Sequence, residues 1–106
     1  MREQVIARIE VAPLGTASTS LSRYVAGCID VLEGTPGVTY QLTAMGTIIQ
    51  GPLERVFEVA QKMHEAPFAQ GASRVLTVLT IDDRRDKPAT IESKVRAVAQ
   101  ARASRK

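Results

Sequence analysis

The sequence predicts an α+β domain with a four-stranded antiparallel sheet, two helices on one of its faces, and an extra helix at the C-terminus. Four short segments have the composition of strands, and three longer segments have apolar residues at spacings of three and four. These segments follow one another in the order β-α-β-β-α-β-α, whose first six elements are the split arrangement of a ferredoxin-like sandwich. A chain of 106 residues builds a single core, so we expect residues 1–106 to form one such domain.

A polar turn separates the first strand from the first helix. Residues 4–11 alternate, with one side formed by Val5, Ala7, Ile9 and Val11. Residues 13–15 end this strand, and the hydroxyl-rich residues 16–20 offer several N-caps for the helix that follows. The apolar stripe of this helix is Leu21, Tyr24, Val25, Cys28, Ile29 and Leu32. We expect Gly34 to end the helix in a left-handed conformation.

The remaining strands and the last helix are predicted from shorter periodic patterns. Residues 38–43 alternate as a strand, with Val38, Tyr40 and Leu42 on one side. Residues 44–46 form a turn or bulge, after which residues 47–50 return as a strand. Residues 75–81 are a run of apolar residues and threonines that predicts a buried strand. Residues 89–101 predict a helix whose apolar side is marked by Ile91, Val95 and Val98.

The second helix is bounded by glycine and proline. We expect Gly51 and Pro52 to begin it, with proline at the first helical position, where a missing amide donor costs nothing. Its predicted buried stripe is Leu53, Val56, Phe57, Ala60, Met63 and Ala66. Gly71 is expected to end the helix, with an earlier end or kink at Pro67 as the alternative.

The sheet of such a sandwich has one face without helices. If the odd-numbered positions of the first strand face the helices, the other face carries Ile6, Arg8 and Glu10. A half-apolar exposed face usually indicates a partner, which here is either a second subunit or the extra C-terminal helix. We therefore expect a homo-oligomer, either a dimer or a tetramer.

The net charge of +3 comes from the end of the chain, because residues 102–106 alone carry three positive charges. We expect this tail to fray, and the neutral remainder lacks the basic stripe of a nucleic-acid-binding protein. No segment approaches the roughly 20 apolar residues of a membrane span. The N-terminus has no secretory apolar region, and a single cysteine cannot form an internal disulfide. We expect a cytoplasmic protein that binds neither nucleic acid nor membrane.

The side chains that usually perform catalysis are scarce. His64 is the only histidine and falls at the edge of the second helix's stripe, where a structural role is expected. Cys28 is the only cysteine and falls within the first helix's stripe, where it is expected in the core. One histidine and one cysteine cannot assemble a zinc site, and the sequence has no phosphate-binding glycine motif. The sequence therefore indicates no catalytic residue and no metal.

Six consecutive charged residues, Asp-Asp-Arg-Arg-Asp-Lys, occupy positions 82–87 between the last strand and the last helix. The three acids and three bases cancel, so this segment is not a self-repelling tail. Asp82 and Asp83 can accept the guanidinium of Arg84 or Arg85, or that of a neighbouring subunit. The simpler interpretation is a solvated loop.

Uncharged polar groups gather at two places that suit a flat polar ligand. The first group lies where the first strand meets the first helix and consists of Thr16, Ser18, Thr19 and Ser20. In the second, Thr43 and Thr47 bracket Met45 and Gly46, where glycine lets a ligand approach the backbone closely. Helix capping and a β-bulge are simpler explanations of the two groups. In the predicted topology the end of the first strand approaches the start of the third, so both groups could line one pocket.

Four motifs occur along the chain: Val-Ala-Pro-Leu-Gly-Thr at 11–16, Met-Gly-Thr at 45–47, Met-His-Glu at 63–65 and Ile-Asp-Asp-Arg-Arg-Asp-Lys at 81–87. Together they are similar to the small thiamine-binding protein family with a YkoF-like ferredoxin fold, and the resemblance covers about residues 5–98. It implies a domain that pairs through its sheets and assembles into tetramers. It also implies that thiamine, or its pyrimidine part, binds near subunit contacts without being turned over.

Two positions depart from the pattern of that family. Many relatives have His-Pro where this chain has Thr43 and Ala44, and many have glutamate where it has Gln50. Gln50 keeps an acceptor for an aminopyrimidine but removes the charge.

We interpret the chain as a non-enzymatic binding protein for thiamine or a related aminopyrimidine, with no further cofactor. The predicted ligand site comprises the hydroxyls of Thr16, Ser18 and Ser20, the turn of Met45, Gly46 and Thr47, and Gln50 as amide partner. Two alternatives remain: an oligomerisation module without a small-molecule ligand, and an enzyme that acts on a thiamine-like heterocycle.

Overall fold

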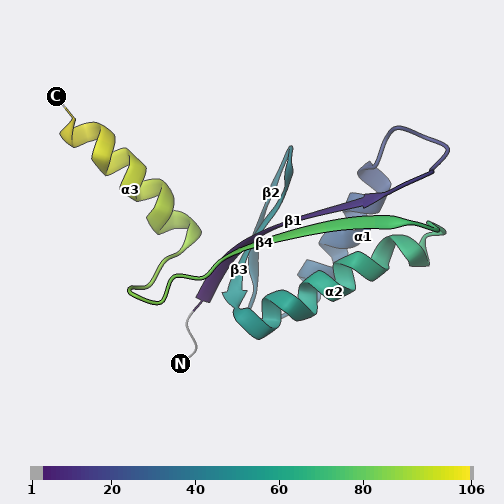
Figure 1. The fold of residues 1–106 in the computed structure, drawn as a ribbon, viewed down its shortest axis with the longest axis horizontal. Coiled ribbons are helices and arrows are strands. Elements are labelled where there is room, and N and C mark those ends of the chain that lie inside the picture. The colour runs from purple at the N-terminus through teal and green to yellow at the C-terminus, as the bar shows by residue number, and fades with distance from the viewer. Residues whose placement is uncertain (1–3, 106) are drawn as a thin grey trace.

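The computed structural model describes residues 4–105, which form four strands and three helices. The elements are β1 (Gln4–Pro13), α1 (Ser22–Glu33), β2 (Thr39–Thr43), β3 (Gly46–Pro52), α2 (Leu53–Ala69), β4 (Val75–Asp82) and α3 (Ile91–Ser104). The strands form one antiparallel sheet in the order β2-β3-β1-β4, with α1 and α2 on the same face (Figure 1). The predicted ferredoxin-like α+β fold is confirmed, including β2 at an edge and β1 beside β3.

The two ladders of β1 differ in length. β1 pairs with β3 from Gln4 only as far as Ile9, which lies opposite Thr47. On its other side it pairs with β4 as far as Pro13. From Glu10 onward, therefore, β1 has a strand on one side only, and the β2–β3 hairpin ends next to this unpaired edge.

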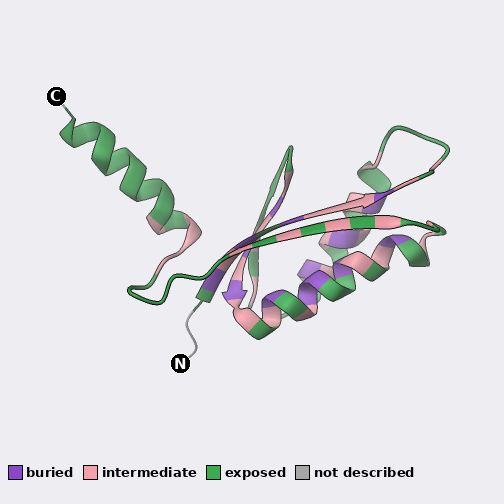
Figure 2. Cartoon of the chain, in the orientation of Figure 1, coloured by how far each residue is buried: buried purple, intermediate pink, exposed green. Residues whose placement is uncertain are grey.

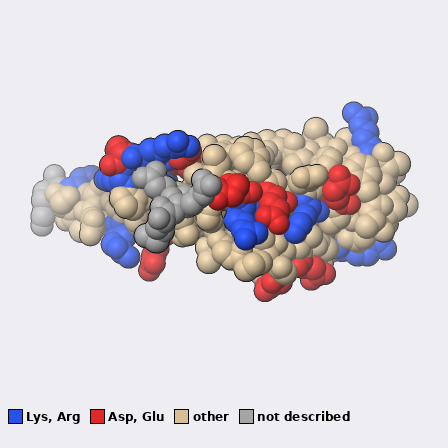
Figure 3. All heavy atoms as spheres, turned by 90° about the horizontal axis from the view of Figure 1, so that it is seen from below, with Lys and Arg blue, Asp and Glu red and all other residues tan. Residues whose placement is uncertain are grey.

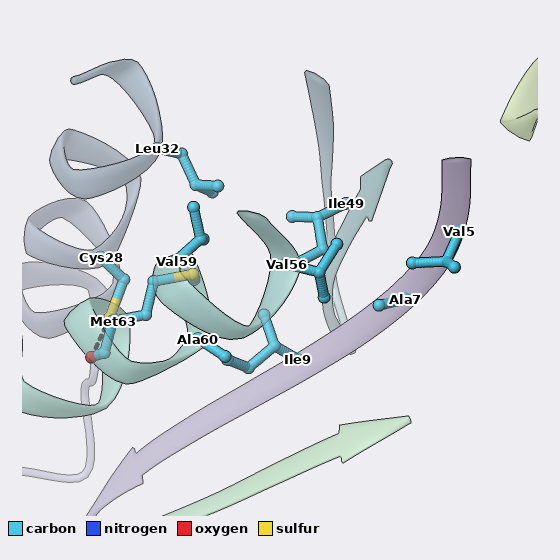
Figure 4. Packing of buried hydrophobic residues seen from close by; sticks show 10 residues of the cluster. All are labelled: Val5, Ala7, Ile9, Cys28, Leu32, Ile49, Val56, Val59, Ala60 and Met63. Carbon is cyan, nitrogen blue, oxygen red and sulfur yellow. Dashed lines mark hydrogen bonds between the residues drawn. The ribbon is translucent and has the colours of Figure 1, made fainter. Parts of the chain in front are cut away.

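The core lies between the sheet and the two helices (Figure 4). Val5, Ala7 and Ile9 of β1 point toward the helices and are buried, as the alternation predicts. They pack with Ile49 of β3 and with buried residues of α1 and α2, among which are Cys28, Leu32, Val56, Val59 and Met63. Among the described residues, the fully buried side chains include Ile9 and Ile49, at 1% and 0% exposure.

Three predictions about helix ends are wrong. Leu21 precedes α1 without a side-chain cap, because the preceding hydroxyls bond within their own loop. Gly34 has φ −86°, and its amide donates to the carbonyl of Asp30, so the left-handed turn falls at Gly37 instead, with φ +83°. Pro52 remains extended, at φ −60° and ψ 146°, and is the N-cap of α2 rather than its first helical residue.

The buried stripe of α2 matches the prediction at every residue but one, since Val56, Ala60 and Met63 are buried and Leu53 and Ala66 pack against the core. Phe57 is 54% exposed, while Val59 is fully buried. Pro67 lies inside the helix and is buried, so it does not end α2. Gly71 adopts φ +99° just beyond the end of the helix, and its amide donates to the carbonyl of Phe68.

The second face of the sheet stays open, and α3 does not cover it. β4 alternates between half-buried and exposed residues, so it is not the fully buried strand that its composition predicted. Leu76 and Val78 are 58% and 44% exposed on the open face. α3 projects away from the sheet and is exposed along nearly all its length (Figures 1 and 2). It continues through Ser104, so the first residues of the predicted frayed tail are helical; Lys106 lies outside the described residues.

Candidate functional site

A cavity of about 180 Å³ lies between the β2–β3 hairpin, β1 and α1. Gly46 and Thr47 form one wall, and Met45 lies at the turn of the hairpin. The apolar walls come from β1, β2 and both helices: Ile9, Val11, Val25, Cys28, Leu42 and Met63. Three of the seven predicted ligand residues, Met45, Gly46 and Thr47, are therefore together here.

The hairpin turn is held by its own threonine. The Thr43 hydroxyl donates to the carbonyl of Gly46 at 2.7 Å and accepts from the amide of Met45 at 3.2 Å. Gly46 has φ +135°, a conformation that residues with a side chain rarely adopt. Met45 lines the cavity and is 75% exposed, and its side chain is apolar and adaptable.

The chemistry of the cavity is apolar with one acid at its edge. Of the described residues that line it, Glu10 alone is charged, and its carboxylate lies 3.4 Å from the Nε of Arg8. Burial raises the pKa of the Cys28 thiol, whose sulfur donates to the carbonyl of Met63 at 3.4 Å (dashed line in Figure 4). Thr47 is only 4% exposed, so its hydroxyl is buried. A site of this kind suits a small heterocycle that has both an apolar face and a positive charge.

The three predicted hydroxyls lie in a different hollow. Thr16, Ser18 and Ser20 line a wide surface depression together with the start of α1 and with Gly71, Ala72 and Ser73. The Thr16 hydroxyl donates to the carbonyl of Ser18 at 2.8 Å, and the amide of Ser20 donates to the Ser18 hydroxyl at 3.0 Å. Tyr24 lines this depression, whereas the next residue of α1, Val25, lines the cavity. The structure thus does not bring the two polar groups into one pocket.

Gln50 lies in neither hollow. Its Nε2 donates to the side-chain oxygen of Gln4, and its Oε1 accepts from the amide of Ile91, both at 2.8 Å. Both ends of the amide are therefore engaged within the protein, and Gln50 joins β1 and β3 to the start of α3. Gln50 therefore lies apart from residues 45–47, and the geometry does not favour a ligand that contacts both.

Comparison with known proteins assigns the chain to a family. Residues 7–99 match the profile of a family described as thiamine-binding protein. The UPF0045 protein YqgV of Bacillus subtilis is 48% identical over 96 residues, which cover 88% of this chain and 92% of YqgV. The chain belongs to the thiamine-binding protein family.

Solved structures share the fold of this family member. Protein MJ1052 of Methanocaldococcus jannaschii, described as hypothetical, superposes with a TM-score of 0.83 at 33% identity, covering 93% of this chain and 98% of that one. A Thermotoga maritima protein with a suggested role in thiamine biosynthesis or salvage gives a TM-score of 0.72 at 23% identity, covering 90% and 98%. At that identity, the second likeness shows the fold alone.

The remaining chemically interesting residues of this family member have structural partners. His64 Nδ1 lies 2.7 Å from the hydroxyl of Thr77, and its ring packs against Phe68 with the centroids 5.6 Å apart. Neither His64 nor Phe68 lines the cavity. No group of three or more His, Cys, Asp or Glu among residues 4–105 could hold a metal ion.

The charged segment 82–87 pairs largely within itself. Arg84 donates two hydrogen bonds to the carboxylate of Asp86, and Arg85 likewise donates hydrogen bonds to the carboxylate of Asp83. These bonds lower the pKa of Asp83 and of Asp86. Asp82 instead pairs with Lys94 of α3. Of the pairs that the sequence suggests, the pair of Asp83 with Arg85 is present, whereas Arg84 pairs with Asp86 instead; both pairs are exposed.

The outer surface of α2 carries charged side chains that face solvent. Arg55, Glu58 and Lys62 form a line of ion pairs on α2, where acidic and basic side chains alternate (Figure 3). None of the described helices is long and apolar enough to cross a membrane. Charge on the helix face and apolar residues on the sheet face make the latter the better surface for a protein partner.

Sequence reasoning missed several residues of the cavity, above all Glu10. The alternation placed Glu10 on the open face, and its side chain does run beside Gly46 there. The signal that could have found it is the register, since β3 begins at Gly46, level with Glu10.

Proposed function

We propose that this protein binds thiamine or a related aminopyrimidine in the cavity beside the β2–β3 hairpin, without converting it. The observation that carries the proposal is the placement of the Met45-Gly46-Thr47 turn in the wall of a small cavity, in a chain that belongs to the thiamine-binding protein family. We assign the ligand contacts to this turn and to Glu10, and not to Gln50 or to the hydroxyls of residues 16–20.

The size and polarity of the cavity favour the pyrimidine ring. Its volume of about 180 Å³ is below the roughly 300–1,000 Å³ of pockets that enclose drug-sized ligands, so it suits one ring. Met45 and the walls of Val11 and Val25 offer apolar contact to the ring faces. Thr47 offers a hydroxyl, and the Glu10 carboxylate complements a protonated aminopyrimidine or the thiazolium cation.

Binding without turnover is supported by the absence of an activated group at the site. The Cys28 thiol lines the cavity, but its raised pKa keeps it protonated and therefore a poor nucleophile. His64, the usual candidate for a general base, lies outside the cavity and is paired with Thr77.

We further propose that the protein works as a homo-oligomer in the cytoplasm. The open sheet face exposes Leu76 and Val78, and apolar residues arranged in this way on a sheet usually contact a second subunit. The single cysteine is a free, buried thiol, as is usual in reducing compartments.

Isothermal titration with thiamine, its phosphates and the free pyrimidine tests the proposal. We expect Thr47→Val to weaken binding of the best ligand about tenfold or more, because losing a buried hydroxyl partner costs about 1–3 kcal/mol. The matched control is Thr16→Val, which removes a hydroxyl from the separate hollow and should leave the affinity unchanged.

Each outcome of the titration decides between the proposal and an alternative. Equal loss in both variants would mean that one ligand spans both hollows. Absence of heat with every ligand would favour the oligomerisation module, and appearance of a product by chromatography would favour an enzyme.

A further inference from the structure

α3 has a continuous apolar stripe that contacts little of its own chain. Val95 and Val98 are 67% and 62% exposed, and no residue between Ile91 and Ser104 is buried. A helix of this length is marginal in water by itself, since most helical stability in proteins comes from packing an apolar face. The stripe therefore requires a partner surface.

The beginning of α3 is nevertheless firmly placed. Thr90 and Ser93 form a reciprocal capping box, with bonds of 2.8 and 3.0 Å. The Ile91 amide donates to Gln50, and Lys94 pairs with Asp82 at the end of β4. A helix fixed at its first turn and free beyond it has the form of an arm rather than that of a loose tail.

A hollow lies between the beginning of this arm and its own sheet. Ile91 and Val95 line one side of it, and residues of β2 and β3, among them Gln41 and Gln50, line the other. The stripe of α3 thus continues the open face of the sheet without closing onto it. An element of another protein chain that entered this hollow would contact both α3 and the sheet.

The open face of a second copy has the matching pattern. Leu76 and Val78 form an exposed pair on β4, and Glu10 lies opposite Val78 on β1. On α3 the pair Val95 and Val98 is followed one turn later by Arg102, a base that complements this acid.

α3 is long enough to cross the sheet. A helix of 14 residues is about 21 Å long, whereas the three spacings of about 4.8 Å between four strands add to roughly 14 Å. The Leu76 end of β4 is remote from the Asp82 end, from which the chain continues to its own α3. The patch that α3 fits is thus best reached by the helix of another copy.

We propose that α3 packs across the open sheet face of a second copy of this chain, in a reciprocal exchange of arms. Val95 and Val98 cover the partner's Leu76 and Val78, and Arg102 comes to lie near the partner's Glu10. This inference rests on the homo-oligomer of the proposed function and names the element that builds it. Because Glu10 also borders the ligand cavity, the arm ends beside the binding site of the other subunit.

The first test is the size of the assembly, measured by light scattering at micromolar concentration. The double variant Val95→Asp/Val98→Asp should reduce the wild-type oligomer to a smaller species, since both positions are exposed in the single chain and their change leaves its core intact. The matched control, Gln100→Asp, places a charge on the opposite side of α3 and should not change the assembly.

The second test shows which surfaces meet. A tagged Val98→Cys variant is mixed with an untagged Val78→Cys variant and treated with a short bismaleimide, which leaves the buried Cys28 unmodified. The mixed cross-linked dimer should exceed that from Gln100→Cys mixed with Val78→Cys. Equal yields from the two mixtures, or a Val95→Asp/Val98→Asp variant that assembles like wild type, would overturn the exchange of arms.

The outcomes separate this proposal from the one on which it rests. If Val78→Asp dissociates the oligomer and the α3 variant does not, the sheet face forms the interface without α3. A wild-type monomer would remove both proposals, while ligand binding remains open to its own titration.

Discussion

Replacing Gly46 by alanine is expected to abolish ligand binding at concentrations that saturate the wild-type protein. A Cβ at this position would lie 3.0 Å from the Cγ of Glu10 and 3.2 Å from the carbonyl oxygen of Ile9, closer than such atoms normally approach. The side chain of Glu10 would have to move, and the turn that carries Met45 and Thr47 would shift with it. Both effects act on the wall of the cavity.

Gly37→Ala is the control for the backbone strain alone. Gly37 has φ +83°, and a Cβ there would meet nothing within 4 Å. Forcing a side chain into a positive φ costs on the order of 1–3 kcal/mol, so both variants should unfold at lower temperature than wild type. Only Gly46→Ala should also lose the ligand in titration. Unimpaired binding by a folded Gly46→Ala protein would place the ligand elsewhere.

The element order was predictable because each element has a periodic signal of its own. β1 shows this best, since the odd-numbered residues Val5, Ala7 and Ile9 are the buried ones, as the alternation requires. In α2 five of the six predicted stripe residues face the core, and only Phe57 does not, because Phe57 and Val59 are both apolar and packing selects Val59. Burial of Val59 leaves the larger Phe57 in solvent.

The site was predictable only in part, because it depends on loop conformation. The hairpin residues were found since glycine between polar residues is a local signal. The hydroxyls of residues 16–20 were assigned to the same pocket from topology, yet their loop bonds to itself and opens into a separate hollow. Gln50 was assigned from the resemblance to a family in which many members have glutamate there, and its bond to Ile91 joins residues 41 positions apart, which no local pattern reveals.

α3 shows a second limit of prediction from a single sequence. The helix itself was predicted, but Val95 and Val98 of its apolar side are 67% and 62% exposed, and the sequence left open whether this helix or a second subunit covers the bare sheet face. Within one chain it does not, because α3 leaves the sheet at Asp82 and points away. Periodicity shows that a surface is to be covered, but it does not show which copy covers it.

Ile49→Ala is expected to lower the free energy of unfolding by about 2–5 kcal/mol, because a fully buried isoleucine leaves a cavity that its neighbours fill only partly. For a domain of this size, about 1 kcal/mol shifts the melting temperature by roughly 4–8 °C, so the variant should melt at least about 8 °C below wild type. Ile49 faces the helices, so this deficit should persist at every protein concentration.

The neighbouring residue supplies the matched control. Ile48 is half-buried on the open face, opposite Arg8, so Ile48→Ala removes the same atoms from the other side of the same strand. If a second copy covers that face, the deficit of Ile48→Ala should be largest where the wild type is assembled and should shrink on dilution, since association adds stability by mass action. A deficit for Ile48→Ala as large as that for Ile49→Ala, unchanged by dilution, would mean that the open face is buried within the single chain and that no subunit is needed to cover it.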